Sequence, residues 1–323
     1  MHERMMAPSP GLLHLLAAPL AVGLSLGVGA ACSSGSTSAA PSGSKDSGAP
    51  IADAAADTTD QEDAGEDAAF SCDAGCPASS LANVTCVATV QASLVDSSGA
   101  PVAGQDLLVC GDNLCSLPGP TDSQGSAQFF LCEAMVLPAL KFLGGAGYVS
   151  FATAVTKENT TFAPITLVPL PATGAAIPMA AGTVASGPVT LAVAAGAVTF
   201  DPSQADTPDI QAFRAAQVDV TKVPAALPAS LSLNVIWGLA PVNATLTPSA
   251  TLTIPNTESW PAGSKVDFYM NGVEPAAGVA VPYGAWGPVG TGTVSQDGTT
   301  ISTDTGAGNG IPVLSMVGVR LHQ

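Results

Sequence analysis

The segment VQASLVDSSGAPVAGQDLLVC, residues 90–110, decides the fold class of this chain. Apolar and polar side chains alternate along its first part and just before it, which is the period of a strand with one buried face. The expected buried face consists of Cys86, Ala88, Val90, Ala92 and Leu94. The sequence Asp-Ser-Ser-Gly at 96–99 predicts a turn, because Asp and Gly favour turn geometries. A second strand is predicted over 105–110, so the segment is β-structure joined by a turn.

Strand patterns of the same kind recur to the end of the chain. They predict strands over 127–132, 148–155 and 165–170, and then around 189–194, 231–237, 250–254, 266–270, 293–295 and 299–301. Asn271-Gly272 and Asp297-Gly298 are typical hairpin turns. One short helix is expected over 209–216. Short strands at this spacing predict an all-β protein with two β-sandwich domains in tandem.

The charge balance excludes one large class of partner. The chain of 323 residues carries 25 acidic and 8 basic side chains, for a formal net charge of −17. The basic residues are scattered singly, whereas nucleic-acid binding needs clustered Lys and Arg to displace counterions. We therefore expect no nucleic-acid partner.

Much of the acidic charge lies within residues 32–71, which otherwise contain Ser, Gly, Ala and Pro and almost nothing to bury. This composition predicts a disordered stalk that holds folded domains away from a surface. A calcium loop is disfavoured, because Asp57, Asp60 and Asp63 are three residues apart and do not alternate around a glycine. The expected organisation is a signal peptide over 1–31, the stalk over 32–71, β-sandwiches over 72–170 and 182–323, and a linker over 171–181.

The first 31 residues have the layout of a signal peptide, with Arg4 at a short basic start and an apolar run over 12–28. This run is short for a spanning helix, which needs about 20 apolar residues. Ala30-Ala31-Cys32 resembles the end of a bacterial lipoprotein signal, although Gly29 stands where that family usually has Leu. The resemblance implies that Cys32 is lipidated and anchors the protein to the outer membrane without a spanning segment. An ordinary secretory signal cut nearby is the alternative.

Six further cysteines lie within one predicted domain, and an even number in an exported chain predicts disulfides. They are Cys72, Cys76, Cys86, Cys110, Cys115 and Cys132. Their pairing stays open, although Cys110 and Cys115 flank the turn-like CGDNLC and are placed to close a small loop. A zinc site from Cys72-x₃-Cys76 and Cys110-x₄-Cys115 is the alternative, because structural zinc prefers closely spaced cysteine pairs. Since no histidine assists and the compartment is oxidising, we expect disulfides and no metal.

Residues 84–170 contain a strand, the sequence D-x-x-G-x-P-V-x-G, a second strand, and T-D-x-x-G before an aromatic strand. In this order they resemble the transthyretin-like domain found beside carboxypeptidases and in many bacterial surface proteins. The matching residues are Asp96, Gly99, Pro101, Val102, Gly104, Thr121, Asp122 and Gly125. The resemblance implies a β-sandwich of a mostly non-catalytic family.

A second resemblance covers the C-terminal part of the chain. The segments that carry it are AAGAVTF (194–200), LTPSATLTIPN (246–256), GSKVDFY (263–269) and GAWGPVGTGTVSQDGTTIST (284–303). They are similar to the β-sandwich shared by ankyrins and netrin receptors. The resemblance implies a domain that mediates protein contacts and carries no active site.

Catalytic groups are scarce in this sequence. Histidine occurs only at positions 2, 14 and 322, which disfavours Ser-His-Asp and Cys-His chemistry. We expect no enzyme and no cofactor. Trp286 is a candidate for stacking on a sugar, and packing against its own sheet is the alternative.

The leading functional hypothesis is a non-enzymatic, lipid-anchored cell-envelope protein for adhesion, binding or scaffolding. Its expected partners are the membrane, reached through an N-terminal lipid, and an envelope protein or glycan. One alternative is a periplasm-facing accessory that binds polysaccharide or an envelope protein. The other is a hydrolase that uses paired carboxylates.

Overall fold

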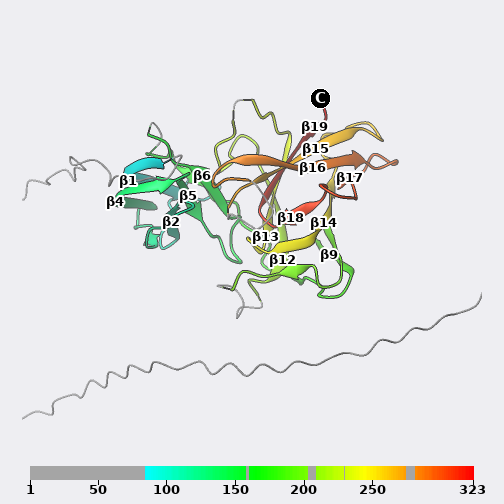
Figure 1. Ribbon diagram of the computed structural model, residues 1–323, viewed down its shortest axis with the longest axis horizontal. Helices are drawn as coiled ribbons and strands as arrows, with labels where there is room; N and C mark the ends of the chain where they lie inside the picture. Colours follow the sequence, from blue (N-terminus) through cyan, green and yellow to red (C-terminus); the bar gives the residue numbers. More distant parts are fainter. Residues whose placement is uncertain (1–83, 158–159, 203–208, 229, 274–280) are drawn as a thin grey trace, which may run out of the picture. The chain divides into compact units, whose positions relative to one another are not determined.

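The computed structural model describes residues 84–323 except 158–159, 203–208, 229 and 274–280. The predicted signal peptide, Cys32, the stalk, Cys72 and Cys76 lie outside the described residues. Within them the chain forms the strands β1 to β19 and no α-helix, so the all-β class is confirmed (Figure 1). Accordingly, nothing helical in this part of the chain is long and apolar enough to cross a membrane.

The strands form three sheets, ordered β4-β1-β7, β3-β2-β5-β6, and a larger sheet that contains all the others. Their bounds are β1 (Val84–Val95), β2 (Asp106–Cys110), β3 (Gly119–Pro120), β4 (Ser126–Val136), β5 (Ala139–Phe142), β6 (Phe151–Ala154), β7 (Ile165–Thr166), β8 (Ala175–Ala176), β9 (Gly182–Ser186), β10 (Val189–Val193), β11 (Val198–Thr199), β12 (Ala212–Val218), β13 (Val235–Ala240), β14 (Thr245–Pro255), β15 (Lys265–Asn271), β16 (Trp286–Val294), β17 (Thr300–Thr303), β18 (Ile311–Val313) and β19 (Met316–Leu321).

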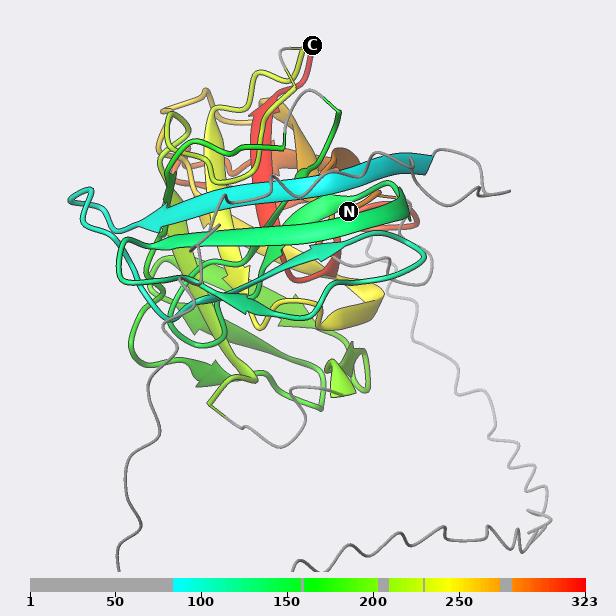
Figure 2. The same cartoon turned by 90° about the vertical axis from the view of Figure 1, so that its left-hand side faces the viewer.

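The first two sheets enclose one core. β1 and β4 are long antiparallel partners that run side by side (Figure 2), and β7 joins β1 in parallel. The buried side chains of this core include Val90, Ala92 and Leu94 from β1, and Leu107, Val109, Leu140 and Phe142 from β2 and β5. The alternation predicted for the opening segment therefore holds from Val90 to Leu94.

The predicted face of β1 is wrong at its N-terminal end. Cys86 is exposed and Ala88 is partly exposed, whereas Val87 is buried. The reason is a shift of register between Val87 and Thr89 in the pairing with β4. Because strand side chains alternate with a period of two, an irregularity of this kind moves the preceding side chains to the other face.

Two turns of sequence D-x-x-G fasten these strands, and both were expected from the sequence. In each turn the Asp Oδ1 accepts hydrogen bonds from the N–H groups two and four residues later, at 2.8 and 3.0 Å for Asp96 and at 2.8 and 2.9 Å for Asp122. The second turn is tied to β1, because the Leu94 N–H donates to the Gly125 carbonyl at 2.7 Å. Gly125 has a φ of 73°, and a Cβ there would lie 2.4 Å from the Leu94 carbonyl oxygen. Glycine is therefore required at this turn.

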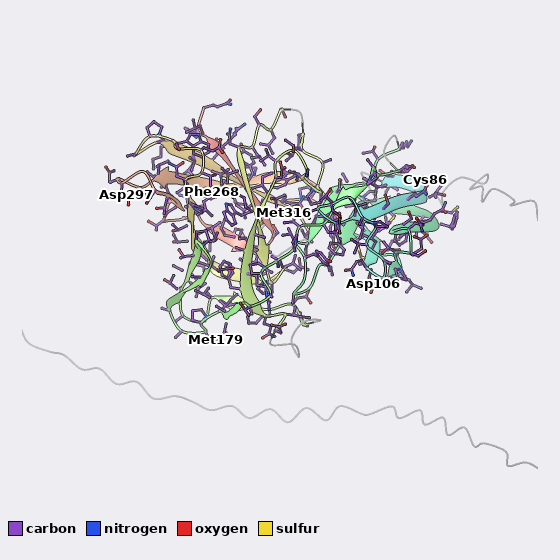
Figure 3. The ribbon with its side chains drawn as sticks, turned by 180° about the vertical axis from the view of Figure 1, so that it is seen from behind. Cys86, Asp106, Met179, Phe268, Asp297 and Met316 are labelled. Carbon is purple, nitrogen blue, oxygen red and sulfur yellow. A yellow bond between two sulfur atoms is a disulfide. The ribbon has the colours of Figure 1, made fainter. Side chains whose placement is uncertain are left out.

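The third sheet contains twelve strands and nearly closes on itself. Its path is β8-β12-β13-β19-β15-β16-β17-β14-β10-β9, and β11 and β18 also pair with β14. The two ends of the path meet, since β8 and β12 contact β9. At this contact the Ala215 N–H donates a 2.9 Å hydrogen bond to the Ser186 hydroxyl. Phe268 lies inside the sheet with 0% exposure (Figure 3).

Strand β13 is buried on both faces. Val235, Trp237 and Leu239 belong to the core inside the large sheet. Ile236 and Ala240 alternate with them and belong to the core of the first two sheets. Because successive strand side chains point to opposite faces, a single strand completes two cores.

Two close approaches fix this junction. A Cβ added to Gly238 on β13 would meet the Val149 side chain at 2.2 Å. Asn271, which is 0% exposed, accepts a hydrogen bond from the Ala152 N–H through Oδ1 and donates one to the Ala152 carbonyl through Nδ2, both at 3.0 Å. Ala152 lies on β6, the edge strand of its sheet. The Asn271 amide therefore pairs with backbone groups that an edge strand leaves open.

Two sequence predictions in the C-terminal part are wrong. The helix expected over 209–216 is the strand β12, because Phe213 and Ala215 are buried inside the large sheet and the strand pairs with β13. Tertiary packing here overrides the helix preference of alanine. Asn271-Gly272 does not form a two-residue turn, since Asn271 pairs with Trp286 and the connection comprises residues 272–285. The side chain of Asn271 is committed instead to β6.

The hairpin predicted at Asp297-Gly298 is confirmed. Val294 pairs with Ile301, and the Gly298 N–H donates to the Ser295 carbonyl at 2.9 Å. Figure 3 places Asp297 at the tip of this hairpin. Its Oδ1 accepts hydrogen bonds from the Ser295 hydroxyl and from the N–H and hydroxyl of Thr299. These bonds lower the pKa of Asp297 from 3.8 to about 2.

The first prediction concerns the contact at Gly238. We expect Gly238→Ala to destabilise the fold by about 1–3 kcal/mol, because the added methyl overpacks a site that Val149 already fills. Urea unfolding measures the effect as a shift of midpoint at constant slope. Adding Val149→Ala makes room for the methyl, so the double variant should be less destabilised than the sum of the single variants. Gly147→Ala is the control, since a Cβ there meets only the Gly144 carbonyl oxygen at 3.8 Å. If the free-energy changes of Gly238→Ala and Val149→Ala added exactly in the double variant, the contact between Gly238 and Val149 would be contradicted.

The second prediction concerns the pH dependence of stability. A carboxyl whose folded pKa lies below its unfolded value stabilises the fold above the unfolded pKa, and loses this effect as pH falls through the folded pKa. The contribution of Asp297 should therefore be complete above about pH 4 and lost toward pH 2. We expect the difference in Tm between the natural chain and Asp297→Asn to shrink over this interval. In a Ser295→Ala background, the change of this Tm difference with pH should be smaller. A Tm difference that does not depend on pH would contradict the lowered pKa of Asp297.

Candidate functional site

A groove of about 560 Å³ lies between β14 and the loop that joins β17 to β18. Its walls combine hydroxyl, amide, carboxylate and glycine groups with the apolar residues Leu246, Pro248, Ala307, Pro312 and Val313. Its lining residues include Thr247, Pro248, Ser249, Asp304, Asn309 and Pro312. The groove is the candidate functional site of the described part of the chain.

Strand β14 opens one side of the groove by changing its pairing. Thr245 pairs with Val313 of β18, and the next pair joins Ala250 to Ile311. A step of five residues along β14 therefore corresponds to a step of two along β18. The intervening residues of β14 form a bulge in its pairing with β18. As a result Thr247, Pro248 and Ser249 are exposed within a strand that is otherwise largely buried.

The other side of the groove is the glycine-rich loop Asp304 to Gly310. Gly306, Gly308 and Gly310 have φ angles of 114°, 82° and 93°, which residues other than glycine rarely adopt. A Cβ on Gly306 or Gly308 would meet nothing within 4 Å. The loop therefore presents open backbone toward solvent, and the next strand, β18, returns the chain to β14.

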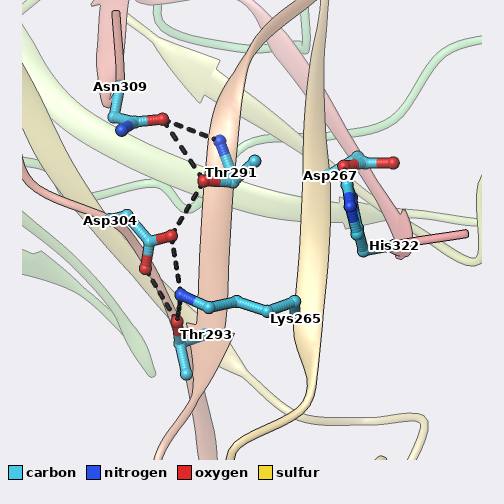
Figure 4. Close-up of polar contacts among 7 residues, drawn as sticks. All are labelled: Lys265, Asp267, Thr291, Thr293, Asp304, Asn309 and His322. Carbon is cyan, nitrogen blue, oxygen red and sulfur yellow. Dashed lines mark hydrogen bonds and ion pairs between the residues drawn. The ribbon is translucent and has the colours of Figure 1, made fainter. Parts of the chain in front are cut away.

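A chain of hydrogen bonds fixes the polar side chains of this loop (Figure 4). Asp304 Oδ2 accepts hydrogen bonds from the Thr291 hydroxyl at 2.8 Å and from Lys265 Nζ at 3.0 Å. Asp304 Oδ1 accepts one from the Thr293 hydroxyl at 2.7 Å. Asn309 Oδ1 accepts one from the Thr291 N–H at 3.0 Å. The loop is thus tied to β15 and β16 on both sides of its glycines.

These contacts also set the charge of the groove. Burial raises the pKa of Asp304, but hydrogen bonds from Thr293, Lys265 and Thr291 outweigh it and hold that pKa below 3.8. Asp304 is therefore an ionised acceptor at neutral pH. It is the one carboxylate among the residues that line the groove.

A second polar cluster lies apart from the groove, on the other side of β15 in Figure 4. Asp267 contacts His322 Nδ1 at 2.6 Å and Arg320 Nε at 3.4 Å. The backbone N–H of His322 also donates a hydrogen bond to the Lys265 carbonyl at 3.0 Å. These contacts tie His322 to β15.

The four described cysteines lie on strands β1, β2 and β4 or in the loop after β2. Cys110 and Cys115 form a disulfide, which closes the CGDNLC loop as expected. Inside that loop Asn113 donates to the Ala134 carbonyl and accepts from the Val136 N–H on β4. Cys86 on β1 and Cys132 on β4 are also disulfide-bonded. The disulfide prediction is thus confirmed for the four cysteines that the structure describes.

Trp286, the candidate for sugar stacking, lies at the start of β16 and away from the groove lining. Its side chain is 9% exposed and packs in the core shared with the first two sheets. This environment matches the alternative expectation that the ring packs against the protein itself.

The first residues of the predicted linker over 171–181 contact Arg214 and Ala212 of β12. Arg214, which is 0% exposed, donates through Nε to the Pro171 carbonyl at 3.0 Å and through a terminal nitrogen to Asp209 Oδ1 at 2.6 Å. A Cβ on Gly174 would lie 2.6 Å from Ala212 and 3.0 Å from Arg214. The linker therefore packs against β12.

Sequence reasoning missed the groove. Asp304 and Asn309 are brought together with Thr247 and Ser249 by strand pairing across more than fifty positions, which no local pattern reveals. Two signals were present in the sequence. One is the run of glycines at every second position in DTGAGNG (304–310), and the other is the hydroxyl-rich stretch TLTPSAT (245–251).

Comparisons with known proteins give no family for this chain. No family model matches it, and no curated protein matches it. Among solved structures, a DUF3823 family protein from Bacteroides ovatus ATCC 8483 is similar over 72% of this chain and 90% of that chain, at 12% sequence identity and a TM-score of 0.20.

Proposed function

We propose that this chain is a non-enzymatic, lipid-anchored cell-envelope protein that binds an envelope component through the groove between β14 and the Asp304–Gly310 loop. The groove carries the proposal, because it combines about 560 Å³ of space with polar groups fixed by hydrogen bonds. Such convergence of polar groups in a concave site is typical of ligand binding.

The composition of the groove favours binding over catalysis. Glycoside hydrolysis by carboxylates needs two of them, on opposite sides of the bond that breaks. The groove lining supplies Asp304 alone. Hydrogen bonds already occupy both oxygens of that carboxylate and keep it ionised, so it suits a fixed acceptor better than a proton donor.

The N-terminal sequence supports the anchored location. Ala30-Ala31-Cys32 resembles the end of a bacterial lipoprotein signal, and Ser33 at the following position favours the outer membrane in that family. A single acyl chain holds weakly, at about 0.8 kcal/mol for each buried CH₂, whereas the three chains of bacterial lipoproteins anchor durably. The acidic stretch up to residue 71 then acts as a stalk.

The β-domains serve as a rigid support in this proposal. The turns at Asp96 and Asp122 are the features that residues 84–170 share with transthyretin-like domains, and each is closed by its own Asp side chain. The C-terminal part resembles the protein-binding β-sandwich of ankyrins and netrin receptors. The first family is mostly non-catalytic and the second mediates protein contacts, which agrees with an adhesion, binding or scaffolding role.

The third prediction tests the anchor. In a Gram-negative host, we expect the natural chain to fractionate with the outer membrane and to incorporate a labelled fatty acid. Cys32→Ser should lose the label and appear in the soluble periplasmic fraction, whereas the neighbouring change Ser33→Ala should keep the label. Digestion of intact cells by added proteinase separates surface display from a periplasm-facing orientation. Membrane retention of Cys32→Ser without label would contradict the lipid anchor.

The fourth prediction tests the groove. Ser249→Arg places a long, charged side chain in the exposed bulge of β14 and should abolish capture of the component that the natural chain retains from envelope extracts. Ser232→Arg is the matched control, because Ser232 is exposed and does not line the groove. Captured material is analysed for proteins by mass spectrometry and for sugars by monosaccharide analysis. Equal capture by both variants would contradict the assigned site.

A further inference from the structure

Asn309 presents two hydrogen-bond donors in a fixed direction. Its Oδ1 accepts a hydrogen bond from the Thr291 N–H at 3.0 Å and lies 3.4 Å from the Thr291 hydroxyl, whose single proton is donated to Asp304. An amide turned by 180° would place its NH₂ group against that N–H, so the orientation is determined by the network. Nδ2 makes no hydrogen bond within the described part of the chain, and Asn309 lines the groove. Its two donors are therefore held ready for a ligand.

Asp304 supplies the complementary acceptor on the same loop. Its Oδ1 accepts one hydrogen bond, from Thr293, and an ionised carboxylate oxygen has a further lone pair. The donors that hold Asp304 come from β15 and β16, outside the groove lining. A donor and an acceptor thus stand five residues apart on one loop. Because each sugar hydroxyl can both donate and accept a hydrogen bond, neighbouring hydroxyls can satisfy both groups.

The remaining walls suit a neutral ligand with many hydroxyl groups. The lining contains threonine and serine hydroxyls and no Lys or Arg. An anionic ligand would meet the Asp304 carboxylate there and approach a chain of formal net charge −17. Pro248, Ala307, Pro312 and Val313 add apolar surface to the lining, which can contact the C–H faces of a sugar ring.

The glycine backbone permits close approach along the loop. Gly306 and Gly308 are exposed, and no side chain stands above them. A ligand can therefore lie directly on the loop between Asp304 and Asn309. At about 560 Å³ the groove is large enough for more than one sugar unit.

We propose that the groove binds a neutral carbohydrate chain, with Asn309 Nδ2 donating to a sugar oxygen and Asp304 accepting from a sugar hydroxyl. This inference rests on the proposed binding function and names its ligand class. An extended peptide is the competing class, and its binding to the groove would contradict the proposal.

The experiment uses an array of neutral oligosaccharides of glucose, mannose, galactose and xylose, three to six units long, with uronate oligosaccharides and extended peptides on the same array. We expect saturable binding to a neutral oligosaccharide and none to uronates or peptides. Titration calorimetry with the bound oligosaccharide then compares variants. Asn309→Asp keeps an oxygen for Thr291 but turns both free donors into an acceptor, and should weaken binding about tenfold or more.

Asn234→Asp is the matched control, since it makes the same change of charge at an exposed position outside the groove, and should bind as the natural chain does. Uronate or peptide binding, or unchanged affinity in Asn309→Asp, would overturn the carbohydrate assignment. An array without any sugar signal would also overturn it. If Ser249→Arg still lost its captured component in that case, the proposed binding function would stand with a different ligand class.

Discussion

The burial of β13 on both faces is the constraint on which the rest of the described structure depends. Val235 and Trp237 complete the core inside the large sheet, while Ile236 lies in the core of the first two sheets. Each fully buried side chain of this size contributes about 1.5–3 kcal/mol. A strand shared in this way couples two sets of sheets, because neither core is complete without it. Gly238 allows the approach, since any side chain there would occupy the space of Val149.

The same junction also satisfies backbone groups of β6, the edge strand of its sheet. Asn271 lends its amide to Ala152 on β6 as a neighbouring strand would lend a peptide group. Asn113 does this for β4 from within the disulfide-closed loop, and Asn256 joins the Trp260 carbonyl to that of Gly298 through Nδ2. Buried backbone groups that lack a hydrogen-bond partner carry a cost of about 1–3 kcal/mol each. Asparagine is suited to offset it, because its side chain carries both a donor and an acceptor.

The sequence predicted what depends on local periodicity and turn chemistry. The alternation from Val90 to Leu94, the D-x-x-G turns and the hairpin at Asp297 all follow from the order of neighbouring residues. The bulge after Val87 and the strand β12 do not, because each is decided by partners far along the chain. The groove was missed for the same reason. Its parts are separate in sequence, and only the pairing of β14 with β18 brings them together.

Closure of the large sheet also explains why the groove lies where it does. β14 pairs with β10, β11, β17 and β18, so it must change partners along its length. Where β14 changes partners, its register with β18 is interrupted, and Pro248 and Ser249 lie exposed at this point. The loop to β18 passes over the same point, and its glycines keep it from filling the space with side chains. The site is thus a consequence of sheet geometry, and the polar residues set its chemistry.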